Sequence, residues 1–314
     1  MKTRRFGSTD LQVSEFGLGC ARIGGIFQQG GGSFVDLLCA ARDAGITFFD
    51  TSNIYSQGES EALIGRAFRG RRHELVIASK AGYALPGRRK LAAKLKPLLR
   101  PIIQKLGLKR EKFSAAVRGS LSQDFSPAGL ERAVEGSLKR LRTDYLDLFQ
   151  LHSPPAEVVE RGEWEQALDR LQRAGKLRYY GISCDSVEAG VAAGRYARVS
   201  ALQFTVSLLE QSKADALLPI AREQKLAVIA RESLANGLLI KPEHELDFSK
   251  YCSSAEEIEL RKRQLREYRE LAAQKGQSLP RLALDYARGL DGVSVTLIGA
   301  KSVDQLRGIL RELA

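Results

Sequence analysis

The chain has 314 residues, of which 44% are hydrophobic and 27% charged, and this is an ordinary globular composition. It excludes a disordered chain, a collagen-like fibre and a disulfide-stapled miniprotein. No apolar run reaches the roughly 18 residues that a membrane-spanning helix needs, so we expect no membrane partner. The first ten residues are basic with no apolar core behind them, and we expect no secretory signal.

The formal net charge of +12 is concentrated in one segment. Residues 85–118 hold eleven Lys or Arg and a single acid, Glu111, so the rest of the chain is close to balanced. A nucleic-acid-binding protein would spread its basic residues over one face of the fold. The segment also has only one aromatic residue, Phe113, whereas binding of single strands uses several. We therefore interpret it as a local insertion and expect no nucleic-acid partner.

Short apolar runs alternate with amphipathic segments along the chain. The runs are brief and bounded by turn residues, which predicts eight strands. In chain order they are Phe16–Cys20, Thr47–Asp50, Leu75–Ser79, Leu146–Leu151, Arg178–Ser183, Ala201–Phe204, Ala227–Ala230 and Val293–Ile298. The predicted helices are Phe34–Ala44, Glu59–Phe68, Pro127–Leu141, Glu163–Ala174, Val187–Ala193, Ala214–Gln224, Ala255–Gln274, Leu279–Ala287 and one after Ser302.

Eight strands, each followed by a helix, predict parallel pairing with right-handed crossovers. We expect a single-domain (β/α)8 (TIM) barrel over residues 1–314, with a doubly wound open sheet as the alternative. Residues 83–126 exceed the length of a regular unit, and we interpret them as a long insertion after the third strand. Pro97 and Pro101 limit any helices there to short ones.

The cysteines predict neither a zinc site nor a disulfide framework. Cys20, Cys39, Cys184 and Cys252 form no Cys-x-x-Cys pair, and the chain has only three histidines. We expect no bound metal, and reduced thiols in a cytoplasmic protein.

Polar residues stand at or just beyond the ends of three predicted strands. Asp50 ends the second strand, Lys80 follows the third, His152 follows the fourth, and Tyr55 lies in the loop beyond Asp50. Each of these residues alone is more often a cap, a turn residue or a solvated side chain. The carboxyl ends of barrel strands converge on one mouth, however, so the four are expected to face one another.

Such a set can transfer a proton. Tyrosine has a pKa near 10, and we expect the ammonium group of Lys80, held by Asp50, to lower the pKa of Tyr55. Tyr55 would then donate a proton to a carbonyl oxygen, and His152 would hydrogen-bond the same oxygen. The hydride must come from elsewhere, and a nicotinamide cofactor is the usual source.

Several segments resemble the aldo-keto reductase family. They are FFDTSNIYSQGESE (Phe48–Glu61), ASK ending at Lys80, and SLKRLRTDYLDLFQLHSP (Ser137–Pro154). The resemblance implies that Asp50, Tyr55, Lys80 and His152 are the catalytic tetrad. It also implies that a β-hairpin at residues 4–13 plugs the bottom of the barrel.

The resemblance further implies an extended cofactor across the barrel mouth, with NADPH/NADP+ favoured and NADH possible. No Gly-x-Gly-x-x-Gly motif supports a Rossmann site. Cys184 stands where the family commonly has Asn. Arg231 stands where many members have an aromatic residue that stacks on the nicotinamide ring. We expect Arg231 either to cover the nicotinamide ring or to pair with an acid such as Glu232. IGAKSVDQL (Ile298–Leu306) resembles the segment that grips the 2′-phosphate, where Lys301 and Ser302 suit a phosphate. The implied cofactor residues are Gly19, Cys20, Ser183, Cys184, Gln203, Arg231, Ser233, Leu234, Gly237, Lys301, Ser302 and Gln305.

The substrate is expected to be a small carbonyl compound or a sugar, near Arg22, Tyr83 and Ser153. The basic insertion forms either a rim that favours anionic substrates or a solvated loop. Two other functions stay open: a nucleotide-binding regulatory or redox-sensor barrel with little turnover, and a basic arm that binds nucleic acid or an anionic membrane. The sequence determines neither the physiological substrate, nor the favoured direction, nor the oligomeric state.

Overall fold

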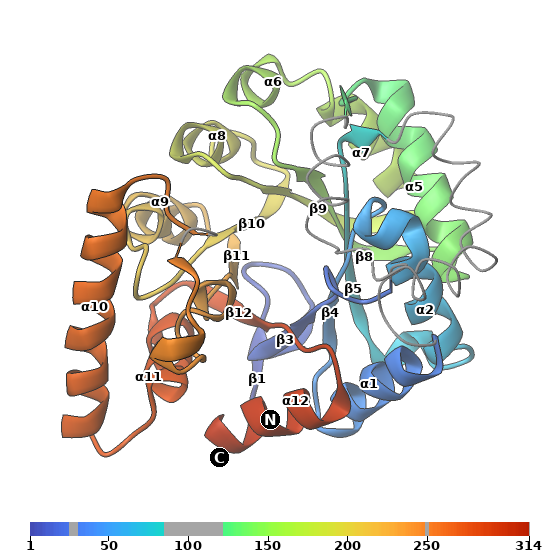
Figure 1. Ribbon diagram of the computed structural model, residues 1–314. Helices are drawn as coiled ribbons and strands as arrows, with labels where there is room; N and C mark the ends of the chain where they lie inside the picture. Colours follow the sequence, from blue (N-terminus) through green and yellow to red (C-terminus); the bar gives the residue numbers. More distant parts are fainter. Residues whose placement is uncertain (25–30, 85–121, 249–250, 314) are drawn as a thin grey trace.

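The centre of the molecule is a closed barrel of eight parallel strands (Figure 1). The computed structural model describes residues 1–24, 31–84, 122–248 and 251–313. The barrel strands are β3 (Phe16–Gly19), β4 (Phe48–Asp50), β5 (Val76–Ala81), β8 (Leu146–His152), β9 (Leu177–Ser183), β10 (Val199–Thr205), β11 (Ala227–Arg231) and β12 (Val293–Ile298). They pair in this order around the barrel, and β12 closes it against β3. The predicted barrel is confirmed, and the open sheet is excluded.

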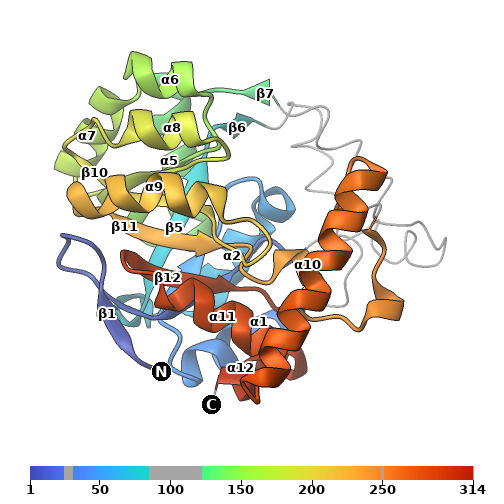
Figure 2. The same ribbon diagram turned by 90° about the vertical axis from the view of Figure 1, so that its left-hand side faces the viewer.

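Helices surround the barrel on its outside (Figures 1 and 2). They are α1 (Gly31–Asp43), α2 (Glu59–Ala67), α5 (Pro127–Leu141), α6 (Ala156–Arg161), α7 (Glu165–Arg173), α8 (Val187–Ala193), α9 (Ser212–Glu223), α10 (Ala255–Gln274), α11 (Leu279–Gly289) and α12 (Val303–Leu313). Among the described residues, no helix combines the length and the apolar character needed to cross a membrane.

Local sequence signals set several helix ends. The hydroxyl of Ser126 accepts a hydrogen bond from the Gly129 N–H at 3.1 Å, and Pro127 follows as the first residue of α5. Helix α6 was not predicted, because its six residues are too few to show a helical period. Strand β5 runs on to Ala81, so Lys80 lies inside the strand and not after it.

An N-terminal hairpin closes the bottom of the barrel, as expected. Strands β1 (Thr3–Arg5) and β2 (Gln12–Ser14) pair antiparallel, and the connection between them carries Phe6. The Phe6 ring is fully buried, with its centroid 5.6 Å from that of Phe48 inside the barrel. Gly7 approaches β11 so closely that a Cβ there would lie 2.5 Å from the Ala227 nitrogen. This end of the barrel is therefore filled by side chains.

The barrel interior changes from apolar to polar along the strands. Its lower part is an apolar cluster that includes Phe48 of β4, Ala78 of β5 and Ala201 of β10. Residues two apart in a strand share a face, so the next inward positions on these strands are Asp50, Lys80 and Gln203. The polar residues are thus brought together at the upper mouth of the barrel.

A short antiparallel ribbon marks the base of the basic insertion. Strands β6 (Tyr83–Ala84) and β7 (Ser122–Gln123) pair, with Tyr83 opposite Gln123. The basic residues between them, and with them the predictions of short helices and of a rim for anionic substrates, lie outside the described residues.

Candidate active site

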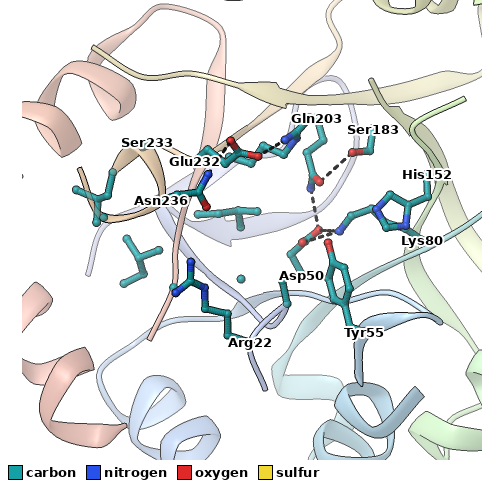
Figure 3. A pocket seen from close by; sticks show the side chains of 18 of the residues that line it. Arg22, Asp50, Tyr55, Lys80, His152, Ser183, Gln203, Glu232, Ser233 and Asn236 are labelled. Carbon is teal, nitrogen blue, oxygen red and sulfur yellow. Dashed lines mark hydrogen bonds and ion pairs between the residues drawn. The ribbon is translucent and has the colours of Figure 1, made fainter. Parts of the chain in front are cut away.

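A cavity of about 600 Å³ opens at the carboxyl ends of the barrel strands (Figure 3). Asp50, Tyr55, Lys80 and His152 all line it, each from a different strand or loop. The structure therefore brings together the four residues that the sequence placed at successive strand ends. Their chemistry follows from burial, charge and hydrogen bonding.

Lys80 and Asp50 form a buried ion pair. The Lys80 Nζ lies 2.6 Å from both carboxylate oxygens of Asp50 and donates to the Thr51 carbonyl at 3.0 Å. The two residues are 1% and 3% exposed. Burial is the largest single effect and lowers the pKa of Lys80, but the charges and hydrogen bonds of Asp50 and Tyr55 together exceed it, so the pKa lies above its usual value. Lys80 is a fixed cation at the bottom of the cavity.

Tyr55 is held as a phenol by its surroundings. Its ring centroid lies 5.2 Å from the Lys80 Nζ. Burial is the largest effect and raises the pKa of Tyr55; the charge of Lys80 lowers it and the charge of Asp50 raises it again, and the net direction is upward. The expectation that Lys80 lowers the pKa of Tyr55 below its usual value was therefore wrong: the net direction is upward.

His152 stands between two tyrosine rings. Its ring centroid is 5.8 Å from that of Tyr55 and 5.2 Å from that of Tyr83, both edge-on. Burial, and then the positive charges of Lys80 and Arg231, hold the pKa of His152 well below its usual range. The imidazole is therefore neutral at physiological pH. Its Nδ1 lies 3.1 Å from the hydroxyl oxygen of Ser52, a residue that the sequence analysis missed.

Gln203, on β10, connects the Asp50 carboxylate to the neighbouring strand β9. Its Nε2 donates to Asp50 Oδ1 at 2.8 Å, and its Oε1 accepts the Ser183 hydroxyl at 3.1 Å (Figure 3). Both ends of the Gln203 amide thus have partners in the protein alone. Within the described chain, the thiols of Cys20 and Cys184 do not line the cavity: they are fully buried and point to the carbonyls of Leu18 and Gln203. The side chains of these two predicted cofactor residues therefore lie away from the cavity.

Arg231, at the end of β11, pairs with two acids. It contacts Glu232, its neighbour, and Asp185, which follows β9. The guanidinium also reaches the Cys184 carbonyl at 3.4 Å. Arg231 lines the cavity, so the ion pairs hold its guanidinium at the cavity wall.

The cavity continues from Arg231 along a turn and reaches helix α12. Ser233, Leu234 and Gly237 line the first part, and Lys301 and Gln305 line the second. The Ser233 hydroxyl is buried and has no hydrogen-bond partner among the described residues, so it is available to a ligand. Ser302 does not line the cavity in the described chain; its hydroxyl caps α12 by accepting the Gln305 N–H at 3.2 Å.

Three cations surround this elongated part of the cavity, namely Arg22, Arg231 and Lys301. Arg22 projects into it from the loop after β3 (Figure 3). A buried unpartnered hydroxyl with cations nearby suits an anionic dinucleotide, so the residues present fit the cofactor that the sequence implied. Among the described residues, no group of three or more His, Cys, Asp or Glu could hold a metal ion.

The ribbon of β6 and β7, at the base of the insertion, is hydrogen-bonded to the residue that follows β8, the strand that carries His152. Gln123 donates through Nε2 to the Ser153 carbonyl at 3.0 Å, and Ser153 adopts a left-handed backbone with φ 52°. Tyr83, Ser153 and Arg22 all line the cavity, as predicted from the sequence. The contact of Gln123 was not predicted, because it depends on the pairing of β6 with β7, two residues each, which is too short to leave a pattern in the sequence.

A closed (β/α)8 barrel with Tyr55 beside the buried Lys80–Asp50 pair at its mouth points to the class of nicotinamide-dependent oxidoreductases. The sequence model of the Aldo/keto reductase family matches residues 17–314. The chain therefore belongs to this family, whose members use NAD(P)H to reduce carbonyl groups.

Individual relatives agree with this assignment. The uncharacterized oxidoreductase YqkF of Bacillus subtilis is 28% identical, over 98% of this chain and 89% of its own length. The holo form of aldo-keto reductase AKR11C1 from Bacillus halodurans is 28% identical, with a TM-score of 0.78 over 100% of this chain and 91% of that one. Glycerol dehydrogenase AKR11B4 from Gluconobacter oxydans is 25% identical, with a TM-score of 0.76 over 99% and 90% of the two chains.

Proposed function

We propose that this enzyme reduces aldehydes or ketones with NADPH, or runs the reverse oxidation of alcohols or sugars, with Tyr55 as the proton donor. The observation that carries the proposal is the grouping of Tyr55 and His152 over the buried Lys80–Asp50 pair at one wall of the cavity. The bound nicotinamide supplies the hydride to the carbonyl carbon.

Proton transfer and orientation of the substrate are assigned to the side chains around the cavity. The Tyr55 hydroxyl donates its proton to the carbonyl oxygen as negative charge develops there. Lys80 stabilises the phenolate that remains, and Asp50 holds Lys80 in place. His152, neutral and beside Tyr55, hydrogen-bonds the same oxygen and orients it. Tyr83 and Ser153 border the space for the rest of the substrate.

The cofactor residues favour NADPH over NADH. For Gln203 and Ser183 we propose contacts with the nicotinamide carboxamide, and for the Arg231 guanidinium a contact with the ring, as the resemblance implies; all three residues line the cavity. For Cys20 and Cys184 we propose backbone contacts only, because their thiols are buried away from the cavity. Lys301 and Gln305, beside the Ser302-capped start of α12, provide a cation near a helix N-terminus for the 2′-phosphate.

Lys301→Ala is expected to raise the KM for NADPH by about 10- to 100-fold, because a charge-assisted contact is lost. The KM for NADH, which has no 2′-phosphate, is expected to stay within about twofold of the wild type, since none of its groups depends on that contact. Initial rates with both cofactors measure this. The matched control is Arg307→Ala, which removes from helix α12, just after Lys301, an exposed cation that does not line the cavity. An equal rise for both cofactors would assign Lys301 to another part of the nucleotide.

The reaction itself is tested by NADPH oxidation with a panel of aldehydes, ketones and sugars, beside NADH. Glycerol with NADP+ belongs in the panel, because one structural relative is named a glycerol dehydrogenase. NADPH-dependent turnover of any member supports the proposal. Tight NADPH binding with no turnover in either direction would replace it with a regulatory or redox-sensor barrel.

A further inference from the structure

The hydroxyl of Ser52 contacts the ring of His152 from beneath the site. Ser52 lies two residues beyond the end of β4 and is 0% exposed. Its Oγ is 3.1 Å from the His152 Nδ1 on β8, which lies 100 residues further along the chain. This contact occupies Nδ1 and leaves Nε2 as the ring nitrogen that can reach a molecule in the cavity.

The protons in this contact can be counted. The neutral imidazole of His152 carries one N–H, on either Nδ1 or Nε2. Ser52 carries one O–H, and besides Nδ1 the Asn53 Oδ1 at 3.4 Å and the Lys80 carbonyl at 3.1 Å lie within reach. That carbonyl already accepts the Asn53 N–H at 3.1 Å. The carbonyl thus keeps a hydrogen bond without Ser52, and the Ile54 N–H approaches the Ser52 Oγ at 3.4 Å as a donor, so the Ser52 proton can go to the His152 Nδ1.

We propose that Ser52 is a positioning residue that donates its hydroxyl proton to Nδ1 of His152 and so keeps the ring proton on Nε2. Its catalytic consequence rests on the proposed function. With this tautomer, a carbonyl oxygen in the cavity meets two donors, the Tyr55 hydroxyl and the His152 Nε2–H. The other tautomer would turn a lone pair of Nε2 toward that oxygen and repel it.

The groups around the ring are consistent with this arrangement. Lys80 and Arg231 place positive charge near His152 and oppose a second proton on it. Tyr55 and Tyr83 meet the imidazole edge-on and fix its plane. Ser52 is the group that sets which of the two nitrogens is protonated.

The tautomer is measured directly by nitrogen NMR of the imidazole rings. The chain has only three histidines, so His73→Gln and His244→Gln assign the other two spectra. In the wild type without substrate we expect Nδ1 of His152 to give a pyridine-type signal and Nε2 a pyrrole-type signal. A pyrrole-type Nδ1 would overturn the proposal, because Ser52 would then be the acceptor.

Variants connect the tautomer to catalysis. Ser52→Ala is expected to shift the His152 nitrogen signals toward a mixture of tautomers and to lower kcat/KM by about 5- to 10-fold, the effect of one hydrogen bond. The Kd for NADPH should stay unchanged. Ser52→Thr keeps the hydroxyl and should restore both the spectrum and the rate. Unchanged His152 signals in Ser52→Ala would overturn the proposal.

Ser60→Ala is the matched control. Ser60 is also 0% exposed, and its hydroxyl bonds to Thr51 at 2.9 Å and to the Cys20 carbonyl at 3.1 Å, not to His152. It should leave the His152 spectrum and kcat/KM unchanged. The nitrogen spectrum can be recorded without turnover, so the proposed role of Ser52 and the proposed function can be contradicted independently of each other. A protein that reduces no carbonyl can still show the predicted tautomer, and an active reductase with a protonated Nδ1 contradicts the role of Ser52 alone.

Discussion

Tyr55→Phe is expected to lower kcat for carbonyl reduction by about 100- to 10,000-fold, the usual contribution of a general acid. The phenyl ring keeps the edge-on contact with His152 but has no proton to give. Lys80 and Asp50 remain paired, so the fold and the cofactor site should persist. Steady-state rates with NADPH, together with the Kd for NADPH from fluorescence titration, separate chemistry from binding.

Tyr83→Phe is the control for this prediction. Its ring also meets His152 edge-on, at 5.2 Å, so the substitution removes a hydroxyl at a similar place. We expect a change in kcat of less than about threefold, because the general acid is still present. If Tyr83→Phe abolished reduction and Tyr55→Phe did not, the proton donor would be Tyr83.

The pH dependence of kcat/KM should follow the raised pKa of Tyr55. Since burial keeps the phenol protonated, reduction should proceed at a constant rate through neutral pH and fall only in the alkaline range. The reverse oxidation needs the phenolate and should accelerate as the pH rises through the same range. His152, whose pKa lies well below its usual range, should contribute no step near neutrality. A fall in reduction between about pH 6 and 8 would point to a histidine acid instead.

The barrel and the grouping of four residues could be predicted because both depend on local pattern. Strand ends are visible in the sequence as apolar runs that stop at a polar residue, and a closed barrel brings these ends to one mouth. Asp50, Lys80 and His152 are each at or next to such an end. Tyr55 lies close to Asp50 in the chain, so the strand that places Asp50 at the mouth also brings Tyr55 there.

Properties that depend on side-chain contacts could not be predicted. The pKa of Tyr55 rises because burial exceeds the effect of a lysine already paired with Asp50, and no pattern in the sequence sets that balance. Gln203 bonds to Asp50 across 153 residues, and Arg231 takes Asp185 in addition to Glu232, the neighbouring acid that the sequence had offered. Such partners follow from the barrel's register and from rotamers, not from spacing.

We expect the Lys80–Asp50 pair to contribute to both the free energy of unfolding and kcat, by two effects that can be measured separately. Lys80→Met is expected to lower the free energy of unfolding by about 3–5 kcal/mol, because it leaves the Asp50 carboxylate buried without its counter-ion. It should also lower kcat, since the Tyr55 phenolate loses its stabilising charge. Urea unfolding and steady-state rates measure the two effects. Lys176→Met, which breaks the exposed pair with Glu135, is the control and should cost less than about 1 kcal/mol.

The double variant Asp50→Asn with Lys80→Met tests whether the buried, unpaired charge of Asp50 causes the loss of stability in Lys80→Met. Removing both charges leaves no uncompensated ion, so most of the lost stability should return. The carbonyl oxygen of the amide introduced by Asp50→Asn could still accept from Gln203, which keeps that link to β9. Activity should not return, because stabilising the phenolate requires the cation itself. A double variant as unstable as Lys80→Met alone would mean that the uncompensated charge of Asp50 is not the cause of the lost stability.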